Sequence, residues 1–353
     1  MTDFLASLDA RERLLAATLA PGVGAETLIT ALLANPANVA DPPGLATRAA
    51  HAWRKAQGDA AFAARFAAER AALRHLDAWF ATPIDADWPA GLPAGVLRGV
   101  GEWPVAAGVA IVGARGADPY GCELAGRIAR AAVERGRTVV SGGAFGIDHA
   151  AHRAALDAGG RTVVVLGSGL DRASPAAHRG LFADAARAGA VVTPFACGQT
   201  ADKWTFPRRN PWIAGLADVV IVVQASARSG ALQTARAALA SSRPVYVVPG
   251  PMDSPLHQGA HALVGEGARL LLHEAAWAHE APPRVAGPAT PPFGLALWRA
   301  AGVEPRPLDA LAAEASLPAT EAAELATLLE LDGWLRGAPG GRFARATPTR
   351  RGA

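Results

Sequence analysis

The feature that most constrains this chain is a series of six short aliphatic segments that alternate with stretches of helical length. They are residues 109–112, 138–141, 162–166, 190–193, 219–223 and 245–248. Strands of this kind, which lack an alternating polar face, are typical of a parallel sheet covered by helices on both sides. The pattern predicts an α/β domain with a Rossmann-like, doubly wound parallel sheet, which we assign to residues 105–280.

The regions on either side of this domain are smaller modules. Residues 1–104 have apolar residues at helical spacing, which predicts a helical domain of the helix-hairpin-helix or SAM-like type. Its Pro-Gly-Val-Gly turn at 21–24 is typical of a phosphate-binding hairpin, but the absence of Arg and Lys between Arg13 and Arg48 favours a plain interhelical turn. A linker at 281–292 with five prolines precedes residues 293–345, where three helices and a short hairpin predict a winged-helix-like domain.

Composition excludes several classes of protein. Hydrophobic residues make up 51% of the 353 residues and charged residues 18%, which excludes a disordered chain. No uncharged apolar run approaches the roughly 18–20 residues of a membrane span, and no signal peptide is apparent. Two distant cysteines, Cys122 and Cys197, exclude a disulfide framework and a zinc finger, so we expect a cytoplasmic protein without a metal or cofactor.

Charge is distributed unevenly along the chain. Residues 105–280 carry 17 basic and 13 acidic side chains, a net charge of 17 − 13 = +4, whereas both flanking modules are slightly acidic. An anion site is therefore expected in the central domain. The third helix of the C-terminal domain contains Glu321, Glu324 and Glu330 and no basic residue, which favours a protein-contact or structural role over docking in a DNA groove.

Glycine-rich loops follow the predicted strands, at the edge where ligands of doubly wound sheets bind. Gly113, Ala114 and Arg115 follow the first strand and precede a helix, an arrangement suited to phosphate. The second loop begins at Ser141 and Gly142, and a third contains Ser229 and Gly230, whose amides and hydroxyl could hold a phosphate. After the second loop we expect Asp148 to cap a helix, and His149 and His152 to be surface histidines rather than metal ligands.

Residues 203–212 contain the highest density of side chains suited to binding a ligand. Cations alternate there with aromatic and amide side chains, namely Lys203, Trp204, Phe206, Arg208, Arg209, Asn210 and Trp212. Phosphate-neutralising cations beside stacking surfaces are typical of single-stranded nucleic acid binding. The alternative, equally favoured for any one aromatic residue, is that Phe206 and Trp212 anchor the core while the arginines cap carbonyls.

Together these loops resemble the DNA processing protein A (DprA, also called Smf) family. The similar segments are Val-Ala-Ile-Val-Gly-Ala-Arg at 109–115, Val-Val-Ser-Gly-Gly-Ala-Phe-Gly-Ile-Asp at 139–148, Val-Leu-Gly-Ser-Gly-Leu-Asp at 165–171, Phe-Pro-Arg-Arg-Asn at 206–210, Arg-Ser-Gly-Ala-Leu at 228–232 and Val-Pro-Gly-Pro-Met-Asp-Ser-Pro at 248–255. Their order and spacing span roughly 109–266, which makes the resemblance specific although each segment alone is not.

The resemblance implies a homodimer, formed through the Rossmann-like domain, that binds single-stranded DNA, protects it during natural transformation and helps load the RecA recombinase. It implies no catalysis and no catalytic residue. Transferred onto this sequence, the DNA- or phosphate-binding residues are Gly113, Ala114, Arg115, Ser141, Gly142, Phe145, Lys203, Phe206, Arg208, Arg209, Asn210, Ser229 and Gly230.

The chain departs from the family pattern at three places. Phe145 stands where a cation is common, Pro211-Trp212 replaces a basic-then-aliphatic pair, and His261 stands where Asn is usual. Fewer cations predict a shallower salt dependence of DNA binding than a typical member has.

Two alternatives remain open within the same Rossmann-like superfamily. The first is an enzyme similar to nucleotide phosphoribohydrolases, although the loop at 228–235 lacks the carboxylate that those enzymes use as acid or base. The second is a sensor whose pocket binds a phosphorylated nucleotide and whose winged helix relays the signal.

Overall fold

A computed structural model describes residues 4–35, 38–85, 87–89, 91–103, 108–280, 295–302, 305–331 and 334–346. The chain divides into two compact units, Met1–Pro283 and Arg284–Ala353. The predicted linker at 281–292 lies outside the described residues. Among the helices described, none is both long enough and apolar enough to cross a lipid bilayer.

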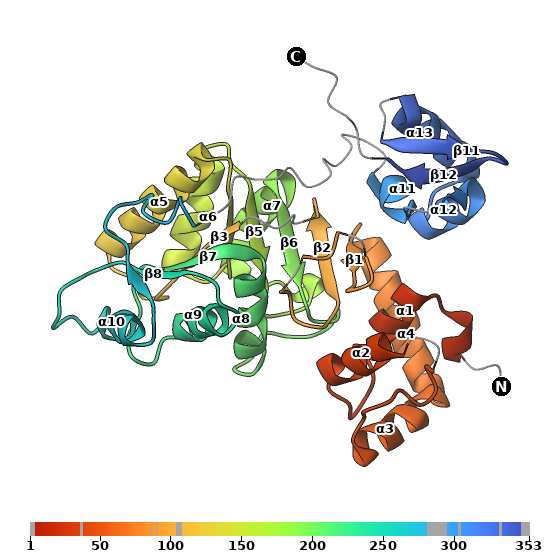
Figure 1. Ribbon diagram of the computed structural model, residues 1–353, viewed down its shortest axis with the longest axis horizontal. Coiled ribbons are helices and arrows are strands. Elements are labelled where there is room, and N and C mark those ends of the chain that lie inside the picture. Colours follow the sequence, from red (N-terminus) through yellow and green to blue (C-terminus); the bar gives the residue numbers. More distant parts are fainter. Residues whose placement is uncertain are drawn as a thin grey trace. The chain divides into compact units, whose positions relative to one another are not determined.

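The first unit is built on a nine-stranded, mostly parallel sheet (Figure 1). Its strand order is β1-β2-β6-β5-β4-β3-β7-β8-β9. The strands are β1 (Trp79–Ala81), β2 (Leu97–Gly101), β3 (Gly108–Val112), β4 (Thr138–Ser141), β5 (Thr162–Val165), β6 (Ala190–Thr193), β7 (Ala217–Val222), β8 (Val245–Val247) and β9 (Arg269–Leu270). All six predicted strands are confirmed, and the chain reverses its direction of travel across the sheet between β3 and β7, which is the switch point of a doubly wound fold.

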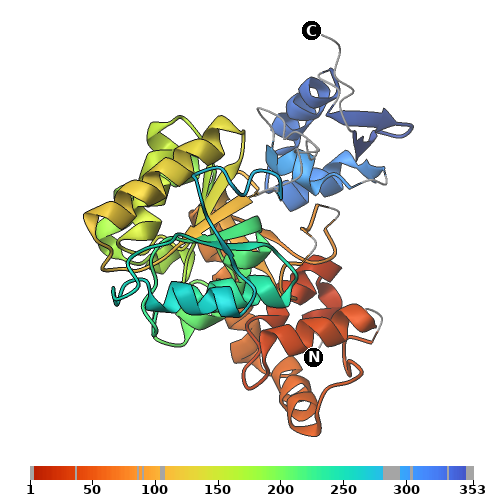
Figure 2. The same cartoon turned by 60° about the vertical axis from the view of Figure 1, so that its left-hand side comes forward.

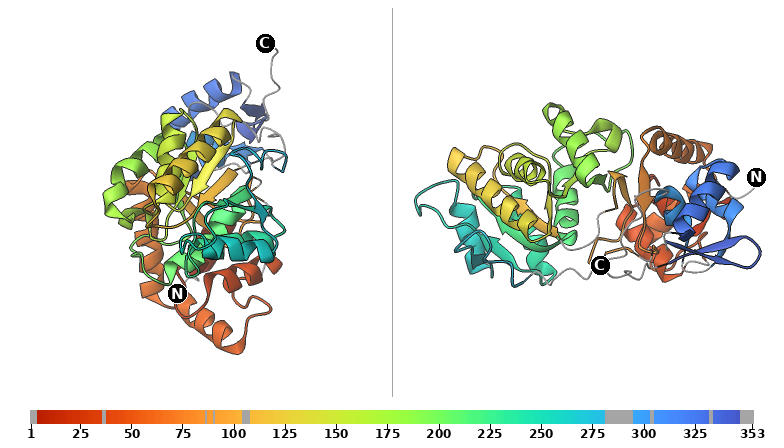
Figure 3. Two further views of the ribbon diagram at one scale, coloured as in Figure 1. Left: turned by 90° about the vertical axis from the view of Figure 1, so that its left-hand side faces the viewer. Right: turned by 90° about the horizontal axis from the view of Figure 1, so that it is seen from above.

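Helices cover both faces of this sheet, as the turned views in Figures 2 and 3 also show. One face carries α5 (Pro119–Glu134), α6 (Ile147–Asp157) and α7 (Arg179–Ala188), and the other carries α8 (Thr205–Gly215), α9 (Ala231–Ala240) and α10 (Gln258–Gly265). Strand side chains alternate between the two layers: Ala110 and Val112 pack toward α8 and α9, whereas Val109 and Ile111 pack toward α5 and α6. The predicted α/β class is confirmed.

The N-terminal region packs four helices around its own apolar core. After the short 3-10 helix η1 (Phe4–Ser7) these are α1 (Ala10–Ala17), α2 (Ala25–Ala34), α3 (Thr47–Gln57) and α4 (Ala60–His75). Trp53 and Phe62 are fully buried among them. The expectation that the first hundred residues are all helical is wrong at β1 and β2, because β2 pairs antiparallel with β6 and β1 pairs antiparallel with β2, which extends the sheet.

The second unit contains α11 (Leu295–Ala300), β10 (Arg306–Pro307), α12 (Leu308–Ala315), α13 (Ala319–Leu331), β11 (Leu335–Ala338) and β12 (Arg342–Arg345). The strands form a small sheet in the order β10-β12-β11. The three predicted helices and the hairpin are confirmed, and β10 is an addition. Trp298 and Leu329 are among the buried side chains of its core.

Candidate nucleic-acid interface

A cavity of about 420 Å³ opens at the carboxyl ends of β3 and β7, at the switch point of the sheet. Its lining comes from the loop after β3, the loop after β7 with the start of α9, the helix α8, the start of α6 with the loop before it, and Leu256. The sequence builds this site because the two buried strands end at Val112 and Val222, and the polar residues that follow lie in loops at the same edge of the sheet.

Arg115 and Phe206 form the mouth of the cavity. The exposed guanidinium of Arg115 lies over the Phe206 ring, with 4.5 Å between its central carbon and the ring centroid. A cation resting on an aromatic face keeps its N–H groups available at the rim. The pair thus offers a phosphate-binding charge next to a stacking surface, the combination that single strands use.

Arg209 forms the floor and is only 5% exposed. Its guanidinium donates to the carbonyl of Gly142 at 2.8 Å and to the carbonyl of Val165. Gly142 must be glycine here, because an added Cβ would lie 2.2 Å from the Arg209 Nη1 atom. Asn210, next along the helix, donates to the Gly230 carbonyl at 3.2 Å and joins α8 to the loop after β7.

Asp148 lies beneath the glycine-rich loop and is also 5% exposed. Its carboxylate accepts from the backbone N–H of Gly142 at 3.1 Å and of Ala144 at 3.3 Å. The expected capping role is wrong: α6 starts one residue earlier, and its N-cap is Gly146, whose φ of 73° suits glycine. Asp148 instead fixes the loop that forms one wall.

The cavity is electropositive. Its charged lining residues are Arg115, Arg209, Arg228 and Asp148, a formal charge of 3 − 1 = +2. Burial lowers the pKa of Arg209 to about 10, with Asp148 opposing the shift, so this arginine stays protonated at neutral pH. Burial raises the pKa of Asp148, and the nearby Arg209 charge opposes that shift.

Most of the predicted site residues line this cavity. They are Gly113, Ala114, Arg115, Phe206, Arg209, Asn210, Ser229 and Gly230. Ser141, Gly142, Phe145, Lys203 and Arg208 are not among its lining residues.

The residues outside the lining have other surroundings. The Ser141 hydroxyl is fully buried and donates to the Ile111 carbonyl at 2.6 Å. Phe145 is 49% exposed and packs its ring edge on His178, with 4.5 Å between centroids. Lys203 and Arg208 are exposed, and Arg208 lies over the Phe195 ring at 5.7 Å.

Among the lining residues that the predicted site lacked, two are charged, Arg228 and Asp148. Arg228 could have been found, because it directly precedes the predicted Ser229 and Gly230 in the same loop. Asp148 could not, because its carboxylate is directed by the fold of a loop rather than by a helical pattern.

The expectation that both His149 and His152 are surface histidines is wrong for His152. His152 is fully buried, and its Nδ1 lies 2.7 Å from the Thr162 hydroxyl. Burial lowers the pKa of His152 to about 3, so the ring is neutral. Within the described part of the chain, no three His, Cys, Asp or Glu residues lie together as metal ligands would.

Sequence comparisons connect both units to one family. The family described as DNA recombination-mediator protein A matches residues 79–281, and the DprA winged helix domain matches residues 281–341. Protein Smf of Escherichia coli (strain K12) is 36% identical over 263 residues, which cover 69% of this chain and 70% of the relative. The DNA processing protein DprA of Streptococcus pneumoniae is 39% identical over 163 residues, which cover 46% of this chain and 57% of that protein.

Solved structures agree with the sequence comparisons. DNA processing protein A from Streptococcus pneumoniae superposes with a TM-score of 0.65 at 29% identity and covers 76% of this chain and 96% of that one. DNA processing protein A from Helicobacter pylori, described for its unique single-stranded DNA binding mode, has a TM-score of 0.50 at 26% identity and covers 57% of this chain and 94% of that one. With the family match extending over more than half of its length, the chain belongs to the DNA recombination-mediator protein A family.

Proposed function

We propose that this protein binds single-stranded DNA in the cavity at the β3 and β7 ends, protects it and helps load the RecA recombinase onto it. The observation that carries the proposal is the Arg115 guanidinium over the Phe206 ring, above a buried, charged Arg209. Arg115 and Arg209 would contact backbone phosphates, and Phe206 would stack on a base. Ser229 and Gly230 would complete the floor through their backbone.

The named relatives support this assignment. The matching family is one of recombination mediators, and the Helicobacter pylori structure concerns single-stranded DNA. Single strands suit the site better than duplex DNA, because unstacked bases can reach an aromatic side chain in a pocket of this size.

Fluorescence anisotropy with labelled single-stranded DNA, at several salt concentrations and with duplex competitor, tests the proposal. We expect salt-dependent binding that prefers single strands, and at least a tenfold loss of affinity in Arg115→Ala. Arg65→Ala, which removes an arginine from α4 in the N-terminal helical core region, is a control that should bind normally. A folded protein that does not bind single strands at low salt would disprove the proposal.

We propose no hydrolytic activity for this cavity. Asp148 is the sole carboxylate among its lining residues, and its oxygens already accept two backbone N–H groups in a buried position. A general acid or base needs access to the substrate. Release of free base from nucleoside monophosphates would contradict this part of the proposal.

We further propose a cytoplasmic homodimer that forms through the Rossmann-like domain, residues 105–280. The last strand of the described sheet, β9, supports this, because Leu270 within it and Leu272 just after it are 45% and 79% exposed. Light scattering after size exclusion should give twice the mass of the 36.0 kDa chain, and Leu272→Asp should shift the protein to a monomer. RecA loading is tested by adding the protein to RecA strand-exchange reactions.

A further inference from the structure

A second hollow, of about 600 Å³, opens in the first unit on the side of the sheet where the N-terminal helices attach. Three segments that lie apart in the sequence line it: Leu76 at the end of α4, the residues from Leu170 to Arg179, and the loop at Thr200 and Ala201 after β6. We call this hollow the basic groove.

The groove has an excess of positive charge. Its charged residues are Arg172, Arg179 and Asp171, a formal charge of 2 − 1 = +1. The Asp171 carboxylate accepts from the Gly198 N–H at 2.8 Å and lies 3.6 Å from the exposed Arg172 guanidinium, so it offsets part of the Arg172 charge. Arg179 is exposed and forms no ion pair with any residue in the described ranges. Its charge is therefore available to an anion.

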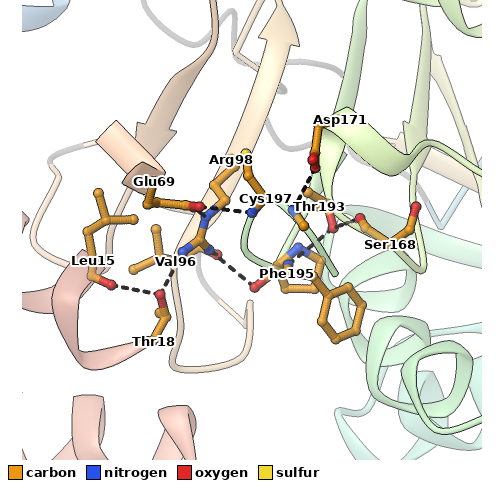
Figure 4. Close-up of polar contacts among 12 residues, drawn as sticks. Leu15, Thr18, Glu69, Val96, Arg98, Ser168, Asp171, Thr193, Phe195 and Cys197 are labelled. Carbon is orange, nitrogen blue, oxygen red and sulfur yellow. Dashed lines mark hydrogen bonds and ion pairs between the residues drawn. The ribbon is translucent and has the colours of Figure 1, made fainter. Parts of the chain in front are cut away.

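Hydrogen bonds hold the chain segments that adjoin the groove, and Figure 4 draws those of Thr193 and Cys197. The Thr193 hydroxyl donates to the Ser168 carbonyl at 2.7 Å, and the Gly169 N–H donates to the Gln199 carbonyl at 2.8 Å. The Cys197 N–H donates to Glu69 on α4 at 2.8 Å, which ties the loop after β6 to the N-terminal helices. A ligand would thus meet a preformed surface and would not have to order these loops.

The groove and the cavity have no lining residue in common, but they lie close together. Phe206 lines the cavity, and it packs so closely on Gly167 that an added Cβ there would lie 2.8 Å from the ring. Three residues further on, Leu170 lines the groove, and three residues of chain span at most about 10 Å. The second connecting segment runs from Ala201 in the groove through Lys203 and Trp204 to Phe206.

Trp204 lies on this connecting segment and is 69% exposed. The Lys203 ammonium lies 5.2 Å from its ring centroid, so the segment presents a second cation next to an aromatic surface. It repeats the chemistry of Arg115 and Phe206 at the cavity mouth. An exposed indole next to a cation is a surface on which a base can stack.

We propose that the basic groove is a second segment of the single-stranded DNA site. A strand with one end in the cavity continues past Lys203 and Trp204, where a base stacks on the indole, and its phosphates then reach Arg172 and Arg179. This inference rests on the proposed function, which it extends by giving the bound strand a length and a direction across the protein surface.

The test measures anisotropy with two labelled oligothymidylates of ~6 and ~20 nucleotides, the shorter one able to fill only the cavity. We expect Arg172→Ala/Arg179→Ala to weaken binding of the long strand about tenfold and of the short strand less than twofold. The salt slope for the long strand should also fall by about 0.7 for each phosphate that the variant no longer neutralises. Trp204→Ala should lower affinity for the long strand only.

Arg187→Ala is the matched control, because Arg187 is an exposed arginine at the opposite end of the same helix α7 and outside the groove. It should bind both strands as the wild type does. If Arg172→Ala/Arg179→Ala binds the long strand normally while Arg115→Ala weakens both strands, the groove inference fails and the proposed function stands. If the wild type binds neither strand, both are overturned.

Discussion

The cavity floor and the junction between the N-terminal helices and the sheet each bury one arginine, and they hold it differently. At the junction, Arg98 on β2 is fully buried and forms an ion pair with Glu69 of α4 (Figure 4). Its guanidinium also donates to the Thr18 hydroxyl at 2.6 Å. Both arginines donate to backbone carbonyls, but in the cavity floor Arg209 donates otherwise to the neutral Asn210 Oδ1 at 3.2 Å, and Asp148 acts on it through its charge.

This difference separates a structural arginine from one suited to a ligand. A carboxylate in direct contact cancels the charge of Arg98, so little field remains to attract an anion. Carbonyls satisfy the N–H groups of Arg209 without removing its charge, and the open cavity lets that charge act on a ligand. Burial of an arginine therefore indicates a site only when its partners are neutral.

The largest effect on stability is expected at the junction between the N-terminal helices and the sheet. Arg98→Met leaves the Glu69 carboxylate buried without its partner, so we expect the free energy of unfolding to fall by about 3–5 kcal/mol in urea titrations. Arg98→Met/Glu69→Leu should recover most of the loss, because the uncompensated charge is gone. A loss below about 1 kcal/mol in the single variant would mean that the junction does not depend on the pair.

Arg209→Met tests the role of the buried arginine in the cavity floor. We expect at least a tenfold loss of single-stranded DNA affinity, because the floor loses its charge, and a loss of about 1–3 kcal/mol in stability from the unsatisfied Gly142 and Val165 carbonyls. Arg209→Lys should keep part of the affinity. If Arg209→Met is less stable but binds DNA normally, Arg209 is structural like Arg98, and the comparison fails.

Acid should destabilise the layer behind the cavity through His152. Its pKa is lowered from 6.5 to about 3 in the folded protein, so below the unfolded value the unfolded chain takes up the proton first. Stability is therefore full above about pH 6.5 and falls as the pH decreases. Between pH 7 and pH 5 we expect a loss of about 2 kcal/mol, measured by urea unfolding.

His152→Gln removes this titration and is the control. An amide can still donate to the Thr162 hydroxyl, so the variant should fold while showing a smaller loss between the two pH values. An equal loss of stability in both proteins would assign the acid sensitivity to other groups. Asp148 is not one of them, because a carboxyl group whose pKa is raised in the folded protein stabilises the folded state as the pH falls.

The sequence predicted the parts of the molecule that periodicity controls. The six parallel strands and the three C-terminal helices follow from hydrophobic spacing, which is a local property. The strands β1 and β2 were missed because three to five residues show almost no period, and these strands depend on long-range pairing, β2 with β6 and β1 with β2. In the candidate site, the strand-end rule brought Gly113 and Arg115 to the same edge as Ser229 and Gly230.

The remaining part of the site depends on long-range geometry. Neither the carbonyl contacts of Arg209 nor the burial of Asp148 can be inferred from neighbours in the chain, because their partners lie on β5 and in the loop between β4 and α6. The packing of α8 on the sheet likewise decides where the aromatic residues of 203–212 lie: Phe206 at the cavity, Trp212 in the core and Trp204 in solvent.

The smallest effect on DNA affinity is expected from substitutions on α13, a helix that carries negative rather than positive charge. Glu321 and Glu324 are exposed on this helix, and we expect Glu321→Gln/Glu324→Gln to change single-stranded DNA affinity less than twofold in the full chain. Removal of acidic groups near bound DNA would raise affinity and steepen its salt dependence, since repulsion of the phosphates would be relieved. A gain in affinity above about fivefold in the anisotropy titration would mean that α13 lies close to the bound DNA. Attraction of phosphate would then depend on α13 as well as on buried arginines with neutral partners. An unchanged affinity would confine DNA attraction to the first unit, where cations stand beside aromatic rings.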